Sequence, residues 1–230
     1  MTAKLERVYV WQLPVRAFHW VNAFCIVVLG VTGFLIGSPV ALRSALEATP
    51  SFWFGTVRFV HFATAYLLTF NFLVRIYWAF RGNTYASWRN FLLVTPRQWR
   101  EVFSVLRVDI LQLRSGPLES TGHNALASLT YFASFLVFLV QVLTGFGLYA
   151  AMSSAFLPRL FRWIVPLLGG DMAVRQLHHV MLWFFVLFTL VHVYLVAFHD
   201  YVEGRGVVSS MVGGWKFVET KAKGPERPAG

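Results

Sequence analysis

Four long runs of apolar residues divide this chain of 230 residues. The last run lies between Arg175 and Asp200, and the 24 positions between these two residues carry no Asp, Glu, Lys or Arg. A helix needs about 20 consecutive apolar residues to cross the hydrocarbon core of a bilayer. The pattern therefore predicts four transmembrane helices, over about residues 17–37, 56–80, 125–151 and 175–199.

The longest polar segment, residues 81–123, lies between the second and third apolar runs. Within it, Thr95 followed by Pro96 is typical of the start of a helix. Apolar side chains then recur at helical spacing, and the arginines fall largely on other sides of that helix. We expect a short helix over about residues 96–114 that lies on the membrane surface. The last residues, 218–230, are expected to be disordered.

The composition is that of a membrane protein. Hydrophobic residues make up 57% of the chain and charged residues only 13%, which is too little polar surface for a soluble domain of this size. We therefore expect one all-α transmembrane domain over residues 1–230, built as a four-helix bundle. The N-terminal residues are too polar for a cleavable signal peptide, so the first apolar run is expected to be a retained helix.

The distribution of charge predicts an orientation. A net charge of +10 would suggest nucleic-acid binding in a soluble protein, but in a membrane protein the excess marks cytoplasmic loops. Four spans place both termini and the polar segment 81–123 on one side, which holds 15 of the 20 Lys and Arg residues. We therefore expect both termini in the cytoplasm and no nucleic-acid partner.

Several histidines lie within the predicted spans, where imidazole is costly and usually has a function and a partner. His178 and His192 are 14 residues apart, so they lie within about 40° of each other around the helix and about 21 Å apart along it. The single cysteine, Cys25, leaves no pair for a disulfide or an iron–sulfur site. Any metal must be held by histidine or carboxylate, or arrive within a cofactor.

Depth along the predicted helices sorts four histidines into two pairs. His61 and His178 lie a turn inside the periplasmic ends of their helices, and His19 and His192 lie in the cytoplasmic halves. Two axial histidines leave haem iron no open position, which suits electron transfer. Two histidines at one level are too few for a closed zinc site. Each pair is therefore predicted to hold one haem iron; the other interpretation is buried histidines with structural partners.

His179 is the other candidate for the periplasmic-side pair. It is 13 residues from His192, which places it about 140° away around the helix. His178 is therefore predicted as the ligand. His179 is expected to face a haem propionate, a neighbouring helix or a partner subunit.

Cations near each histidine pair are candidates for contacts with the haem propionates, which are anions. Arg58 and Arg175 flank the periplasmic-side pair, and Arg16 and Arg75 flank the cytoplasmic-side pair. The alternative is that these arginines only set the topology.

A candidate quinone site lies near the cytoplasmic surface. His123, Asn124 and His199 are expected there, and such side chains can hydrogen-bond quinone carbonyls and pass protons. The alternative is that they are solvated residues of the interface.

Two short segments resemble each other. LGVTGFLIG, at residues 29–37, and QVLTGFGLYA, at residues 141–150, both place Thr-Gly-Phe in the periplasmic part of a helix. Small residues there allow a close approach by a neighbouring helix or a flat ligand. The alternative is ordinary packing of small residues.

Six stretches, spread through nearly the whole chain, carry a resemblance to a known family. They are VWQLPVRAFHWVN (10–22), TGFLIGSP (32–39), RFVHFATAYLLTFNFLVRIYWAFRGN (58–83), GHNALASLTYF (122–132), RQLHHVMLWFFVLFTLVHVYL (175–195) and SSMVGGWKF (209–217). On these stretches the chain resembles the di-haem cytochrome b subunits of membrane-bound NiFe hydrogenases, which are related to the gamma subunits of formate dehydrogenases.

The resemblance implies a multi-pass electron-transfer subunit in the bacterial inner membrane. It implies two haem b groups, with His61 and His178 on the periplasmic side and His19 and His192 on the cytoplasmic side. The implied partners are the hydrogenase small subunit, whose C-terminal helix lies beside the cytochrome, and through it the large subunit. The implied electron acceptor is menaquinone or ubiquinone, with residues 122–124 near its pocket. The chain alone is not expected to oxidise hydrogen.

Three alternatives stay open at this stage. The same haem bundle can serve another periplasmic oxidoreductase, such as formate dehydrogenase. A second alternative is a membrane anchor without a cofactor. A third is a transporter with a histidine proton relay, although no acidic residue lies deep in any predicted span.

Overall fold

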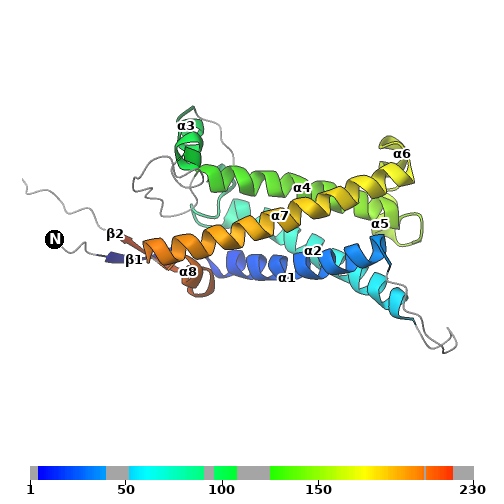
Figure 1. Cartoon of the computed structure of the whole chain (residues 1–230), viewed down its shortest axis with the longest axis horizontal. Helices are drawn as coiled ribbons and strands as arrows, with labels where there is room; N and C mark the ends of the chain where they lie inside the picture. Colours follow the sequence, from blue (N-terminus) through cyan, green and yellow to red (C-terminus); the bar gives the residue numbers. More distant parts are fainter. Residues whose placement is uncertain (1–4, 40–51, 91–95, 108–124, 205, 220–230) are drawn as a thin grey trace, which may run out of the picture.

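Four long helices dominate the computed structural model, which describes residues 5–39, 52–90, 96–107, 125–204 and 206–219 (Figure 1). They are α1 (Leu13–Gly37), α2 (Trp53–Arg81), α4 (Ala125–Tyr149) and α7 (Asp171–Glu203). Each is long and apolar enough to cross a membrane. The four predicted spans are confirmed, and their ends differ from those of the helices by at most four residues.

The bundle has two distinguishable ends. At one end lie the strands β1 (Leu5–Tyr9) and β2 (Trp215–Glu219) and the short helix α8 (Val207–Gly213), and we call this the ribbon end. At the other end lie α5 (Phe156–Leu160) and α6 (Ile164–Leu167), and we call this the far end (Figure 1). The helices α1 and α4 run from the ribbon end to the far end, and α2 and α7 return.

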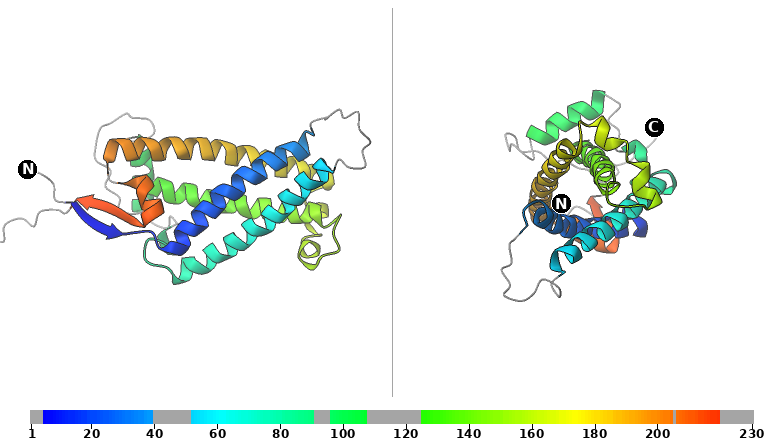
Figure 2. Two further views of the ribbon diagram at one scale, coloured as in Figure 1. Left: turned by 90° about the horizontal axis from the view of Figure 1, so that it is seen from below. Right: turned by 90° about the vertical axis from the view of Figure 1, so that its right-hand side faces the viewer.

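The helices pack as two antiparallel pairs, α1 with α2 and α4 with α7, while α7 also packs against α1. Seen along the bundle, the four long helices form a ring (Figure 2). All four meet at mid-height through an aromatic and aliphatic cluster, which we call the waist. Its buried members are Cys25, Leu68, Phe72, Phe138 and Phe185.

Aromatic contacts join the waist across the bundle. The ring of Phe138 on α4 packs edge-on against Phe185 on α7, with ring centres 4.8 Å apart. It also stacks with Phe72 on α2 at 5.8 Å. Such aromatic pairs stabilise a core by about 1 kcal/mol beyond the apolar area they bury. The waist therefore fixes the spacing of the helices between the two ends.

Local signals in the sequence explain several helix ends. Pro14 lies in the first turn of α1, where its missing N–H removes no helical hydrogen bond. The side-chain oxygen of Gln12, the residue before α1, accepts hydrogen bonds from Trp78 Nε1 at 3.0 Å and from the backbone N–H of Asn83 at 2.9 Å. The start of α1 is thus tied to the end of α2. At the other terminus, α7 stops at Gly204, which adopts a left-handed conformation with φ of 61°.

The ribbon end contains a feature that the hydrophobic pattern did not predict. β1 and β2 pair in antiparallel register from Leu5 with Glu219 to Tyr9 with Trp215. β2 also takes in the first two residues of the segment 218–230 that was expected to be disordered, and residues 220–230 lie outside the described part of the chain. Two segments near opposite ends of the sequence are therefore joined by main-chain hydrogen bonds.

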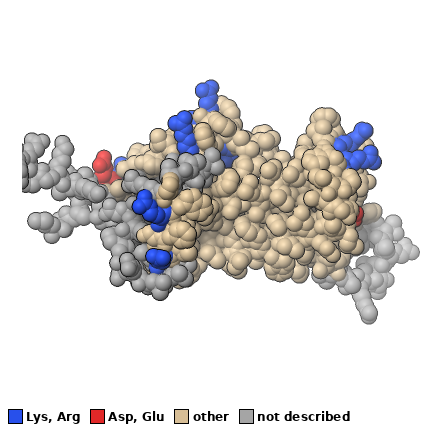
Figure 3. All heavy atoms as spheres, turned by 90° about the horizontal axis from the view of Figure 1, so that it is seen from above, with Lys and Arg blue, Asp and Glu red and all other residues tan. Residues whose placement is uncertain are grey.

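A helix is present where the surface helix was expected, as α3 (Pro96–Val105), followed by a π-helical turn over residues 106–107. Its remaining predicted part, residues 108–114, lies outside the described residues. On the face shown in Figure 3, charged side chains gather toward the two ends of the molecule, and a broad band between them carries almost none. Such a band is typical of a surface that contacts lipid.

Candidate functional site

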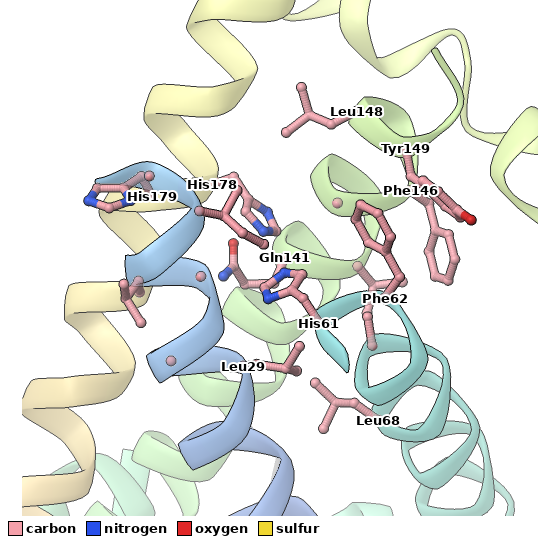
Figure 4. Close-up of a pocket in the computed structure, with 18 of the residues that line it drawn as sticks. Leu29, His61, Phe62, Leu68, Gln141, Phe146, Leu148, Tyr149, His178 and His179 are labelled. Carbon is pink, nitrogen blue, oxygen red and sulfur yellow. The ribbon is translucent and has the colours of Figure 1, made fainter. Parts of the chain in front are cut away.

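His61 and His178 line one cavity near the far end, and we call it the far-end site (Figure 4). The cavity has a volume of about 750 Å³ and is lined by residues of all four long helices. Cofactor pockets in proteins have volumes of about 300–1,000 Å³. The lining is mainly apolar and aromatic, with Leu29, Phe62 and Phe146 among its members. The cavity is thus large enough for a cofactor. Its polar lining residues besides the histidines are Arg58, Tyr66, Thr69, Gln141, Tyr149, Arg175 and Gln176.

His61 and His178 are each hydrogen-bonded to a threonine of the neighbouring helix. Thr32 Oγ1 on α1 lies 2.9 Å from His61 Nδ1 on α2. Thr144 Oγ1 on α4 lies 2.8 Å from His178 Nδ1 on α7. Both hydrogen bonds use Nδ1, so the other ring nitrogen, Nε2, is available to a ligand in the cavity.

The glycine after each threonine leaves room for the same imidazole ring. A Cβ atom on Gly33 would lie 3.3 Å from His61 Cε1, and a Cβ atom on Gly145 would lie 3.1 Å from His178 Cε1. Contacts this short require the ring to move. The two similar Thr-Gly-Phe segments therefore have the same function at the far end: each provides a hydroxyl and a space for one histidine ring.

His179 lies apart from this arrangement although it lines the same cavity. Its ring packs against Gly37 on α1, where a Cβ atom would lie 3.0 Å from its Cε1. Figure 4 shows His178 toward the centre of the cavity, near Gln141 and His61, and His179 on the side of α1. This difference supports the choice of His178 over His179 as the partner of His61.

His19 on α1 and His192 on α7 face each other nearer the ribbon end, and we call this pair the ribbon-end site. Their ring centres are 6.2 Å apart, with the planes inclined at 53°. Two imidazoles that bind one metal ion from opposite sides, each through a bond of about 2 Å, have ring centres about 6 Å apart. The buried Nδ1 of His19 has no hydrogen-bond partner among the described residues. The pair is therefore close enough to share one metal ion.

The waist separates the two sites. Phe185 stands seven residues after His178 and seven before His192 on α7, and a helix rises about 10 Å over seven residues. Leu68, Phe138 and Phe185 of the waist also form the floor of the far-end cavity. Apolar side chains therefore fill the bundle between the two histidine pairs.

The four arginines predicted near the sites have other side chains or carbonyls as partners. At the far-end site Arg58 and Arg175 both line the cavity. Arg58 Nη2 lies 2.6 Å from Met152 Sδ, and Arg175 forms an ion pair of 2.5 Å with Asp171. The Arg58 and Arg175 side chains are thus held at the cavity by contacts that a bound anion can supplement.

Near the ribbon end the two arginines connect different elements. Arg16 donates a hydrogen bond to the Val212 carbonyl of α8. Arg75 is buried, donates to the Ala86 carbonyl at 3.2 Å and lies over the ring of Tyr131, 5.4 Å from its centre. These contacts join α1 to α8 and α2 to the segment that follows it.

Of the three candidate quinone residues, the structure describes only His199. His123 and Asn124 lie outside the described residues. His199, near the ribbon end of α7, has its Nδ1 2.7 Å from the Leu195 carbonyl, one helical turn earlier. The structure therefore does not test whether these residues come together.

Sequence reasoning overlooked three side chains of the far-end site. Thr32 and Thr144 were noticed only as parts of a repeated small-residue segment, and their hydroxyls are the histidine partners. Gln141 lies in the cavity, and its buried side-chain oxygen has no hydrogen-bond partner among the described residues. The repetition of Thr-Gly on two helices, each opposite a histidine, was the signal in the sequence.

Four long helices that can span a membrane, with two histidine pairs at different depths on either side of an apolar waist, define a class of helical membrane protein. Comparison with known proteins identifies the family. The family described as "Prokaryotic cytochrome b561" matches residues 10–214, and the chain belongs to this family. It is a multi-pass protein of the bacterial inner membrane.

Curated relatives cover most of the chain. A protein of Azotobacter vinelandii is 42% identical over 218 residues, which are 93% of this chain and 90% of the relative. A protein of Cupriavidus necator is 42% identical over 92% of this chain and 88% of its own length. Both bear the name "Probable Ni/Fe-hydrogenase B-type cytochrome subunit". An Escherichia coli K12 protein, named as the hydrogenase 1 counterpart, is 35% identical over 90% of each chain.

Proposed function

We propose that this chain is the cytochrome b subunit of a membrane-bound NiFe hydrogenase and that it holds two haem b groups, one at each histidine pair. The observation that carries the proposal is the presence of two histidine pairs at different depths of one helix bundle, each drawn from two helices. The names of the curated relatives and the family membership support the same function.

The residues of the far-end site fit a haem. The cavity has a suitable volume and an apolar lining, and the buried side-chain oxygen of Gln141 is without a partner among the described residues. His61 and His178 would be the axial ligands through Nε2, because Nδ1 of each is bonded to a threonine. Arg58 and Arg175, which line the cavity, are candidates to contact the propionates.

The residues of the ribbon-end site also fit. His19 and His192 have the ring separation expected of two ligands of one metal ion, with Arg16 and Arg75 as candidates to contact the propionates. A haem with two axial histidines supplies a one-electron couple without an open coordination position. The remaining task of the protein is to hold the histidines at fixed depths, and the apolar side chains of the waist lie between the two pairs.

The proposed partners follow from the resemblance and from the names of the relatives. Oxidation of one dihydrogen molecule by a periplasmic hydrogenase yields two electrons and two protons. Reduction of one quinone, menaquinone or ubiquinone, consumes two electrons and two protons. This chain would accept the electrons from the hydrogenase small subunit, whose C-terminal helix lies beside it, and deliver them to quinone near the cytoplasmic face. His123, Asn124 and His199 are the candidate residues there, with both termini in the cytoplasm.

The test is haem content per chain together with the reduced-minus-oxidised absorption spectrum of the protein purified from native membranes. We expect two haems per chain and the bands of b-type haem. A well-folded preparation without such bands would contradict the proposal and leave the membrane-anchor alternative. Identification of the co-purifying partner distinguishes a hydrogenase from a formate dehydrogenase.

A further inference from the structure

Thr32 and Thr144 occupy equivalent places on opposite sides of the far-end cavity. Each belongs to a Thr-Gly-Phe segment, is buried, and lies within 2.9 Å of Nδ1 of one histidine. We infer that these two threonines are positioning residues: they fix which ring nitrogen of His61 and His178 carries the hydrogen, and how each ring is oriented. They thereby lower the reduction potential of the haem that these histidines hold. The inference rests on the proposed function.

The hydrogen-bond geometry assigns the proton. A threonine hydroxyl has one hydrogen to donate. Thr32 Oγ1 lies 2.6 Å from the Val28 carbonyl oxygen, and two oxygens so close must have a hydrogen between them. The hydroxyl therefore donates to the carbonyl and accepts from His61, whose Nδ1 carries the proton. Thr144 Oγ1 lies 2.7 Å from the carbonyl four residues earlier, so the same assignment holds for His178.

This protonation state leaves the lone pair on Nε2, the nitrogen that a metal ion in the cavity requires. The reverse tautomer would place an N–H group in an apolar cavity and would prevent binding through that nitrogen. The adjacent glycines, Gly33 and Gly145, admit each ring beside the helix at a distance that a methyl group would obstruct. One residue of each segment thus selects the tautomer, and the next sets the place of the ring.

His179 provides an internal comparison. It also packs against a glycine of α1, Gly37, but no hydroxyl is seen bonded to it in the described part of the chain. The residue before Gly37 is Ile36, whereas the residues before Gly33 and Gly145 are threonines. The presence of the hydroxyl therefore separates the two proposed ligands from their neighbour.

The consequence for the iron follows from the direction of the hydrogen bond. A ligand histidine that donates its second N–H to an oxygen becomes a more basic ligand. A more basic ligand stabilises the oxidised iron more than the reduced iron, and hydrogen bonding around the ligands is one of the means by which a protein sets a haem potential. Removing either hydroxyl should therefore raise the potential of the far-end haem and leave that of the other haem unchanged.

The experiment is a redox titration of the haem absorbance in the complete complex, with Thr32→Val and Thr144→Val compared with Thr32→Ser and Thr144→Ser. Valine removes the acceptor and keeps the size, and serine keeps the acceptor. Thr69→Val is the matched control. Thr69 also lines the cavity and bonds a carbonyl of its own helix at 2.8 Å, but within the described ranges it has no hydrogen bond to a histidine. Haem content and the low-temperature electron paramagnetic resonance spectrum are measured in parallel.

We expect each valine variant to keep two haems and to shift one reduction equilibrium toward the reduced form by on the order of tenfold, which is about 59 mV for a one-electron couple. The serine variants and Thr69→Val should match the unsubstituted protein. Loss of one haem in a valine variant, restored by serine, also supports the inference.

Unchanged potentials in valine variants that keep both haems would overturn the inference, as would an equal shift in Thr69→Val or loss of haem in the serine variants. An unsubstituted protein without haem would instead overturn the proposed function. The two failures are therefore distinguishable.

Discussion

The far-end and ribbon-end sites present histidines in different ways. At the far end, both rings are bonded through Nδ1 to buried threonines and lie against glycines. At the ribbon end, aromatic neighbours hold the rings: His19 meets Trp20 edge-on at 5.1 Å, and His192 stacks on Phe188 at 5.5 Å. His192 is exposed, and His19 Nδ1 has no partner among the described residues.

The difference shows that one chain orders its two histidine pairs in different ways, by hydrogen bonds at one depth and by packing at the other. Hydrogen bonds fix both the tautomer and the direction of the ring, whereas packing leaves the tautomer free. We therefore expect the far-end site to be the more sensitive to small changes in the helices around it.

Replacement of a proposed ligand should have the largest effect. His61→Ala or His178→Ala should remove the far-end haem, and His19→Ala or His192→Ala should remove the other, each lowering haem content from two per chain to one. Haem extraction and optical spectra measure the result. His179→Ala is the matched control and should keep both haems. The opposite pattern at His178 and His179 would show that the choice of ligand is wrong.

Loss of a waist ring should affect both sites together. Phe138 contacts Phe72 and Phe185, so Phe138→Ala should lower the free energy of unfolding by about 3–5 kcal/mol. The measurement is thermal unfolding in detergent, followed through the absorbance of each haem. We expect both haems to be released at the same lower temperature. Release from one site alone would mean that the waist does not couple the two ends.

Filling the space beside a far-end ligand should affect that site alone. Gly145→Ala puts a methyl group 3.1 Å from His178, and should weaken far-end haem binding by about 10- to 100-fold. Gly30→Ala is the control, since its Cβ would meet Leu182 at an ordinary 3.6 Å. Haem retention during dilution measures the difference. Equal retention in both variants would contradict the role of the glycine.

A mild change at the ribbon end should leave the haems in place. Trp20 Nε1 donates to the Met211 carbonyl of α8 at 3.1 Å, and Trp20→Phe removes this bond but keeps a ring beside His19. We expect a loss of about 1 kcal/mol in stability and no loss of haem. Trp20→Ala also removes the packing and should reduce haem content at this site. Equal haem content in the two variants would argue against packing as the means of ordering.

The long apolar runs made the four spans predictable, because a bilayer sets their length. Helical phase and depth also led to His19 with His192, and the structure places these rings 6.2 Å apart. The role of Thr32 was not predictable from its type alone, since a threonine in a membrane helix usually bonds only its own backbone. Thr32 does so as well, as the donor, and its hydroxyl oxygen can accept from His61 only when α2 is in place.

The pairing of β1 with β2 could not be predicted for a different reason. The strands lie about 200 residues apart in sequence, and each has only five residues. The two strands pair because the helix bundle brings them together at the ribbon end. Arg75 is a similar case. It contacts Tyr131 of α4 and Ala86 of the segment after α2, and the pattern of apolar residues predicts neither contact.

The position of α7 in the chain has a consequence for biogenesis. Both histidine pairs include one residue of this helix, which is the last of the four spans: His178 completes His61, and His192 completes His19. The preceding three spans contain only one member of each pair. A ribosome-bound chain that has inserted α1, α2 and α4 thus has neither pair complete. If the two pairs hold haem as proposed, haem binding would indicate that the insertion of all four spans has finished.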